Sequence, residues 1–320
     1  MEMDIPTHPR GAKAHGHYMT NDDESVKIPA MMVKEEGFQA VYKAIKSYKW
    51  KDEDFLLATY PKNGTNFMWE IMTMLLRGTA EYIKDFKSLC MADLFPVTKL
   101  DEDNLFPSPR VLNTHYRLEG LPSEFGGKKT VLVIRNPKDV CVSYFNMESR
   151  LPWPKVGHVD GDIKSMSLDN YIKIFLYGKD VPFGNYFDYI DYMWNLRDLP
   201  NVHLVYYEDL ILEPVETIKK LDDFMGTGRP LELIEQIADA TSFDKMQKGK
   251  ASQGHDNKAL LSILRTDEAT LQKTLKLMFR KGKIGDWKDT FTVADNELFD
   301  AFLDQWQTGK EIPFKYVAHK

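Results

Sequence analysis

Apolar residues occur in short continuous runs that alternate with stretches of helical spacing. Four runs have the length of buried strands, at residues 54–60, 110–116, 129–136 and 201–210. Four stretches repeat apolar positions about every 3.6 residues, as amphipathic helices do, at residues 37–50, 64–78, 137–147 and 213–226. Strands that alternate with helices predict an α/β fold, with a central, mostly parallel sheet flanked by helices on both faces.

Helix boundaries support this reading. Pro137 stands in a first helical turn, where proline is tolerated, and Gly226 follows the last apolar position of the 213–226 stretch. We expect residues 1–25 to be a disordered leader and residues 26–320 to form a single domain. Two polar stretches rich in glycine or proline are expected to be loops that cover a site, at residues 149–167 and 248–258.

The stretch TYPKNGTN, residues 59–66, predicts an anion-binding loop. It ends a strand and starts a helix, whose first N–H groups are free to meet an anion. Gly64 permits backbone geometry that other residues avoid, and Lys62 adds a positive charge. The Gly-Lys-Ser/Thr ending of an ordinary P-loop is missing, so the loop is only P-loop-like.

Other candidate residues also follow strand ends. His115 and Asn136 lie at the ends of two further predicted strands. In open α/β sheets ligands gather beyond the carboxyl ends of the strands, so these residues should line one cleft. Arg135 and the Arg280–Lys281 pair, followed by Gly282, add cations that could close on a phosphate.

Composition narrows the function. The chain is 43% hydrophobic and 28% charged, and its net charge of −6 disfavours a general nucleic-acid partner. Cys90 and Cys141 are the only cysteines, so no disulfide framework is expected, which fits a cytoplasmic protein. No apolar stretch is long enough to span a membrane, and no carboxylate motif predicts a metal site.

Five motifs in order resemble the cytosolic sulfotransferases, which transfer a sulfuryl group from 3′-phosphoadenylyl sulfate (PAPS). They are TYPKNGTN (59–66), RNPKDVCVSY (135–144), YYEDL (206–210), TSF (241–243) and RKGKIGDWKDTFT (280–292). Their order and spacing match the family over roughly residues 40–310.

The resemblance implies a role for each matching residue. His115 matches the catalytic base, Lys62 would assist the departing phosphate, and Ser143 would be a third catalytic residue. The loop for the 5′-phosphosulfate would comprise Lys62, Asn63, Gly64, Thr65 and Asn66. The 3′-phosphate would bind Arg135, Ser143, Arg280, Lys281 and Gly282, and adenine would bind Phe67, Tyr207, Thr241 and Phe243. PAP, 3′,5′-adenosine bisphosphate, would be the product, and no metal is implied.

The sequence departs from the family at a few of these positions. Asn63, Asn66 and Phe67 replace the usual Ser, Thr and Trp of the loop. Asn113 stands where many animal members have a lysine two residues before the histidine. Lys288, Thr292, Val293 and Glu297 fit the family's short dimer motif, which implies a readily dissociated homodimer.

The acceptor is expected to be a small, apolar molecule with a hydroxyl or amine group. Aromatic and methionine residues are candidates for its pocket, namely Phe95, Phe106, Tyr116, Phe145, Met147, Trp153 and Tyr177. Two alternatives stay open from the sequence. One is a magnesium-dependent nucleotide phosphotransferase, and the other is a nucleotide-binding protein without catalysis.

Overall fold

The computed structural model describes the backbone of residues 18–20 and 27–29, and then residues 43, 45–83, 87, 90–93, 97–102, 105–118, 121, 127–150, 165–178, 183–253, 269 and 280–316. Trp153, Phe95 and most of the predicted leader lie outside these residues, and so does half of the predicted helix at 37–50. Three residues of the expected leader form β1 (Tyr18–Thr20), which pairs antiparallel with β2 (Lys27–Pro29).

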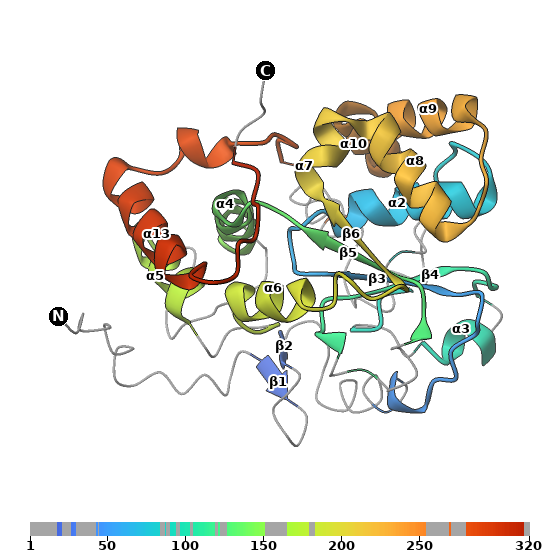
Figure 1. The fold of residues 1–320 in the computed structure, drawn as a ribbon, viewed down its shortest axis with the longest axis horizontal. Helices are drawn as coiled ribbons and strands as arrows, with labels where there is room; N and C mark the ends of the chain where they lie inside the picture. Colours follow the sequence, from blue (N-terminus) through green and yellow to red (C-terminus); the bar gives the residue numbers. More distant parts are fainter. Residues whose placement is uncertain are drawn as a thin grey trace.

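A four-stranded parallel sheet forms the centre of the molecule (Figure 1). Its strands are β3 (Phe55–Thr59), β4 (Val111–Thr114), β5 (Thr130–Ile134) and β6 (Val202–Tyr206). The order across the sheet is β4-β3-β5-β6, so β4 and β5 lie on opposite sides of β3. All residues of β3, β4 and β5 are buried, which explains their continuous apolar runs. The α/β prediction is confirmed.

Helices cover one face of the sheet (Figure 1). They are α2 (Thr65–Arg77), α8 (Pro214–Met225), α9 (Leu231–Ala240) and α10 (Phe243–Gln253). Helix α2 packs on β3 and β4, and α8 packs on β6. Gly78 and Gly226 end α2 and α8 in the left-handed conformation, which glycine adopts without a steric penalty.

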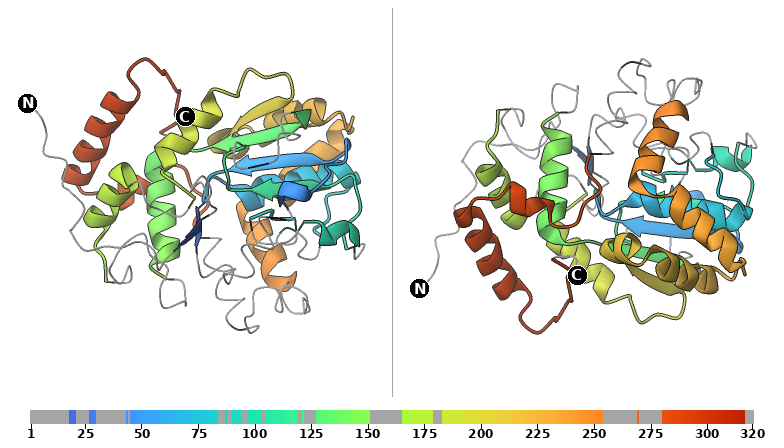
Figure 2. Two further views of the ribbon diagram at one scale, coloured as in Figure 1. Left: turned by 90° about the horizontal axis from the view of Figure 1, so that it is seen from below. Right: turned by 90° about the horizontal axis from the view of Figure 1, so that it is seen from above.

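A second group of helices stands beyond the strand ends. It contains α4 (Pro137–Glu148), α5 (Leu168–Tyr177), α6 (Tyr186–Trp194) and α13 (Val293–Trp306). In both views of Figure 2 the arrowhead of β3 points toward α4. The carboxyl ends of the strands, where we predicted the ligand, therefore face this group. Two short elements complete the described fold, α3 (Lys99–Glu102) and the 3-10 helix η4 (Asp286–Asp289).

The sequence analysis misplaced two segments. Only the first part of residues 201–210 is a strand, because α7 (Tyr207–Leu212) begins directly after β6. The buried Glu208 explains the break, since its carboxylate accepts the backbone N–H of Asn136 rather than facing outward on a strand. The polar stretch at 248–258 was expected to be a loop, yet its residues up to Gln253 continue α10, because lysine, alanine and glutamine favour a helix.

Candidate active site

The loop from β3 to α2 turns sharply on two residues. Lys62 has φ 72° and Gly64 has φ 102°, both in the left-handed region. A side chain at Gly64 would place its Cβ 2.6 Å from Cδ2 of Tyr207, so glycine alone allows the loop to pack against that ring. No side chain caps the N-terminus of α2. Its first N–H groups are therefore available to an anion held by the loop.

Arg135 joins this loop to the carboxyl ends of β5 and β6. Its Nη1 donates a hydrogen bond to the Lys62 carbonyl at 3.0 Å, and its guanidinium lies 4.1 Å from the centre of the Tyr207 ring. Asn63 adds a second tie, because its Nδ2 donates to the Val133 carbonyl in β5 at 2.9 Å. The carboxyl ends of β3, β5 and β6 are thereby held together around Lys62.

Asn136 and Glu208 fix the position of Arg135. The side chain of Asn136 accepts the Lys138 N–H at 2.9 Å and so caps α4. The Asn136 N–H in turn donates to Glu208 Oε1 at 2.9 Å. Burial raises the pKa of Glu208 to about 7. The backbone next to Arg135 is thus held by a helix cap and by a buried carboxyl group.

The C-terminal segment reaches the same place from far along the chain. Asp139 in α4 accepts the N–H groups of Gly285 at 2.8 Å and of Trp287 at 3.1 Å. Arg280 and Lys281 both pair with the buried carboxylate of Asp286. Gly282 lies so close to the Phe243 ring that a Cβ would sit 2.1 Å from it. This contact brings together the segments predicted to bind phosphate and adenine.

The charges of these segments act on Lys62. Burial, together with the positive charges of Arg135, Arg280 and Lys87, lowers the pKa of its ammonium group to about 7. The Nε atoms of Arg135 and Arg280 are buried and have no hydrogen-bond partner in the part of the chain that the structure describes. Cations with buried, unused donor atoms fit a polyanionic ligand.

His115 lies at the end of β4, on the other side of β3. Its Nδ1 is 2.7 Å from the carbonyl oxygen of Thr59. Because a carbonyl only accepts hydrogen bonds, Nδ1 carries the proton and Nε2 has the free electron pair. Burial lowers the pKa of His115 to about 3, so the imidazole is neutral throughout the physiological range. A neutral histidine with a free Nε2 can accept a proton.

The surroundings of His115 contain residues that the sequence analysis missed. Asp93 accepts the His115 N–H at 2.6 Å and the Thr114 hydroxyl at 2.6 Å, and burial raises its pKa to about 7. The ring of Phe183 contacts the imidazole edge to face at 5.1 Å. Asp93 precedes His115 by 22 residues and Phe183 follows it by 68, so no local pattern links them.

Other predicted residues lie farther from this cluster or pack elsewhere. Phe67 contacts Tyr207 at 6.2 Å, as expected for one pocket. Ser143 is half-buried, two turns into α4 from Arg135, and the Thr241 hydroxyl donates to Ile237 within its own helix. Among the acceptor candidates, Tyr177 packs on Phe302 and Phe106 on Trp69, which makes both of them part of the packing between elements.

Among the described residues, no group of three or more histidine, cysteine, aspartate or glutamate side chains is arranged to hold a metal ion. Within that same part of the chain, no helix is long and apolar enough to cross a membrane.

A family model described as the sulfotransferase domain matches residues 52–311. The chain belongs to the PAPS-dependent sulfotransferase family. This sulfotransferase is 32% identical to mouse sulfotransferase 1A1 over 277 residues, which cover 83% of the chain and 88% of the relative. It is 30% identical to rat sulfotransferase 1C2 over 284 residues, which cover 84% and 88%.

Solved structures share the fold of this chain. Mouse sulfotransferase SULT7A1 complexed with PAP superposes with a TM-score of 0.69 at 24% identity, over 92% of this sulfotransferase and 96% of that chain. A retinol dehydratase, in complex with androsterone and the inactive cofactor PAP, gives a TM-score of 0.68 at 16% identity, over 94% and 92%. At these identities the likeness shows the shared fold.

The contact between Gly64 and Tyr207 makes a testable prediction. Gly64→Ala should weaken PAP binding at least about tenfold, or 1.4 kcal/mol, because the new Cβ must displace the Tyr207 ring. Titration calorimetry measures this affinity. Gly228→Ala is the matched control, since Gly228 has φ 63° with nothing within 4 Å of an added Cβ. It should lose about 1 kcal/mol of folding stability from the same backbone strain but keep its PAP affinity. Unchanged binding by Gly64→Ala would contradict the proposed close contact.

Proposed function

We propose that this sulfotransferase transfers a sulfuryl group from PAPS to the hydroxyl or amine of a small, apolar acceptor. One observation carries the proposal. Cations from three segments, namely Arg135, Arg280 and Lys87, act on Lys62, and a neutral histidine with a free Nε2 stands at the neighbouring strand end. The first feature suits a phosphorylated anion, and the second suits removal of a proton from a weak nucleophile.

The donor would lie across the ends of β3, β5 and β6. Its 5′-phosphosulfate would meet Lys62, Asn63, Gly64, Thr65 and Asn66. Its 3′-phosphate would meet Arg135, Ser143, Arg280, Lys281 and Gly282, and its adenine would lie by Phe67, Tyr207, Thr241 and Phe243. The unused donors of Arg135 and Arg280 and the two glycines under aromatic rings support this placement.

The transfer would proceed as an in-line displacement. The acceptor gives its proton to Nε2 of His115 as its oxygen forms a bond to sulfur. The bond between sulfur and the 5′-phosphate oxygen breaks, and its electron pair stays on that oxygen. Lys62 offsets the negative charge that grows there, so positioning and charge stabilisation supply most of the catalysis.

Replacing His115 tests its role as the base. His115→Ala should lower kcat by about a thousandfold, within the range of general-base effects, while PAP binding persists. Transfer of labelled sulfuryl from PAPS to a panel of phenols, alcohols and amines measures the rate, and mass spectrometry identifies whether the product is a sulfate ester or has lost the sulfate by elimination.

His203→Gln is the control for that experiment. His203 lies in β6 and stacks on Phe224 at 5.0 Å, away from the strand ends, so its replacement should leave turnover unchanged. Normal turnover by His115→Ala would remove His115 as the base. PAPS binding by the unaltered protein without transfer to any acceptor of the panel would instead favour the non-catalytic alternative.

The lowered pKa of Lys62 predicts how PAP binding depends on pH. A bound anion stabilises the protonated lysine, whose pKa in the free protein is about 7. Binding above pH 7 must therefore take up a proton, and affinity should fall with rising pH by up to about tenfold per unit until the bound form also titrates. Below pH 7 Lys62 is already protonated and contributes no such change.

Titration calorimetry from pH 6 to pH 9 checks this dependence. Lys62→Met should bind weakly and lose the component of the pH dependence that Lys62 provides. Lys49→Met, which changes an exposed lysine, should retain the full dependence. An affinity of the unaltered protein that stays constant from pH 7 to pH 9 would show that Lys62 does not titrate there.

We also propose a readily dissociated homodimer in the cytosol. Lys288, Val293 and Glu297 are exposed, and Val293 is exposed to 76%, which is unusual for an apolar residue that starts a helix. Thr292 caps α13 through a reciprocal bond with Asp295, which holds the segment in shape. The buried free cysteines, Cys90 and Cys141, fit a reducing compartment.

Val293→Glu should convert the dimer into a monomer, because the charge would be buried at a small interface. Sedimentation at several protein concentrations measures the association. Leu231→Glu, which changes another exposed apolar residue at 55% exposure, should leave it unchanged. If Val293→Glu dimerises as strongly as the unaltered protein, the contact lies elsewhere.

A further inference from the structure

The segment that ends at Asp93 runs beside the end of β4. The Asn113 N–H donates to the Cys90 carbonyl at 2.8 Å, and the Ala92 N–H donates to the Asn113 carbonyl at 2.9 Å. Met91 and Asn113 form a parallel bridge. These bonds hold residues 90–92 as an edge partner of the strand that ends at the catalytic histidine.

Side-chain bonds hold the same segment at its two ends. At one end, Nδ2 of the fully buried Asn113 donates to the carbonyl oxygen of Lys87 at 3.1 Å. At the other end, Asp93 accepts bonds from Thr114 and His115. Asn113 and His115 are two residues apart, so they share one side of the strand. The backbone of Lys87 is therefore fixed beside the residues that lead into His115.

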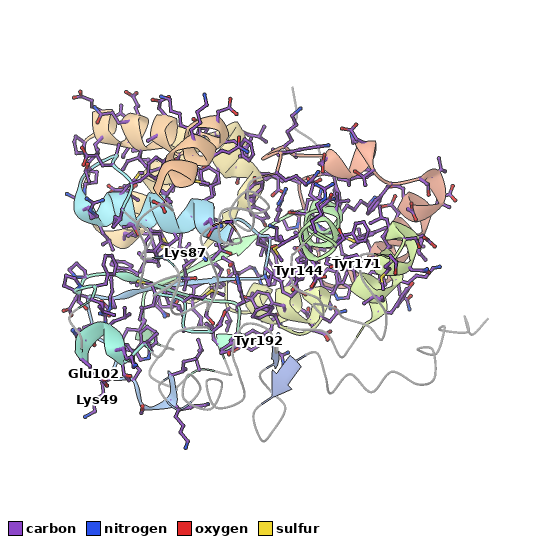
Figure 3. All side chains as sticks on the ribbon, turned by 180° about the vertical axis from the view of Figure 1, so that it is seen from behind. Lys49, Lys87, Glu102, Tyr144, Tyr171 and Tyr192 are labelled. Carbon is purple, nitrogen blue, oxygen red and sulfur yellow. The ribbon has the colours of Figure 1, made fainter. Side chains whose placement is uncertain are left out.

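The charge of Lys87 acts on both His115 and Lys62. Its ammonium group lowers the pKa of His115 and also that of Lys62. Two other cations act on Lys62, namely Arg135 after β5 and Arg280 of the C-terminal segment, whereas Lys62 and Lys87 are the cations that act on His115. Lys87 is half-buried, and it lies near α2 and the sheet in Figure 3.

We propose that Lys87 supplies a second cation to the sulfuryl-transfer step, and that Asn113 positions it by binding its carbonyl oxygen. This inference rests on the proposed sulfuryl transfer. As the acceptor oxygen bonds to sulfur and gives its proton to His115, the electron pair of the broken bond stays on the phosphate oxygen beside Lys62. Lys87, from the side of His115, and Lys62, from the side of the phosphate, both stabilise the negative charge of the reacting group.

This arrangement explains why a buried amide occupies position 113. The Asn113 side chain carries no charge, but it binds the backbone of a lysine that comes from another segment. Position 113 thus carries the residue that holds the cation, while the cation itself comes from Lys87.

The experiment measures kcat for sulfuryl transfer together with PAP affinity. Lys87→Ala should lower kcat about tenfold to a hundredfold, and Lys87→Arg should keep most of it because the charge remains. PAP affinity at pH 6, where Lys62 is protonated in both proteins, should change less than threefold and shows that the variant is folded. Lys49→Ala is the control, since Lys49 is exposed and lies near Glu102, away from Lys87 (Figure 3).

A second measurement separates an electrostatic role from a merely structural one. Loss of the Lys87 ammonium should raise the pKa of Lys62, so the decline in PAP affinity should begin at higher pH in Lys87→Ala than in the unaltered protein. The double variant Asn113→Lys with Lys87→Ala, which returns a charge to the same strand end, should recover part of the lost kcat.

Two results would overturn the inference. One is a Lys87→Ala protein with unaltered kcat, and the other is an unaltered pH dependence of PAP binding. If Lys87→Ala does not fold, Lys87→Gln repeats both measurements with a longer neutral side chain. If the unaltered protein transfers no sulfuryl group, the proposed function fails, and the shift in pH dependence still tests the electrostatic part of this inference by itself.

Discussion

Burial of like charges beside one another is the constraint on which this site depends. Lys62 is brought next to Arg135 and within the field of Arg280, and burial together with the neighbouring positive charges lowers the pKa of its ammonium group to about 7. A folded protein tolerates such an arrangement only where other contacts hold the cations in place. We propose that the free energy lost by crowding them would be recovered on binding of a polyanion, which would make the site selective for ligands with phosphate groups.

Hydrogen bonds and ring contacts hold the cations in place. Arg135 is bound to the Lys62 backbone and stacked on Tyr207, while Asp139 anchors the C-terminal segment through two backbone N–H groups. Next to Asp139, the buried ammonium of Lys138 donates to Asn296 in α13 at 2.7 Å and lies 4.4 Å from the Trp287 ring. The start of α4 therefore ties the sheet, η4 and α13 together. The site can be rigid although its residues come from distant parts of the chain.

The parts of this picture that follow from the sequence are those with a local signal. The run at 54–60, the glycine at 64 and the helical spacing after it sufficed to predict β3, the loop and α2, and Pro137 sufficed for the start of α4. The strand predicted at 201–210 was too long, since the partner that breaks it, Asn136, is 72 residues away from Glu208. Asp93 and Lys87 were missed for the same reason, because they meet β4 through hydrogen bonds between segments that no periodicity connects.

The central claim is that this site recognises a nucleotide with a phosphate at both the 3′ and 5′ positions. Thermal unfolding in the presence of PAP or of ADP, each with and without magnesium, tests it most directly. The cations after β5 and in the C-terminal segment predict that PAP raises the melting temperature more than ADP at equal concentration, with no requirement for magnesium. A larger rise with ADP, dependent on magnesium, would contradict the account.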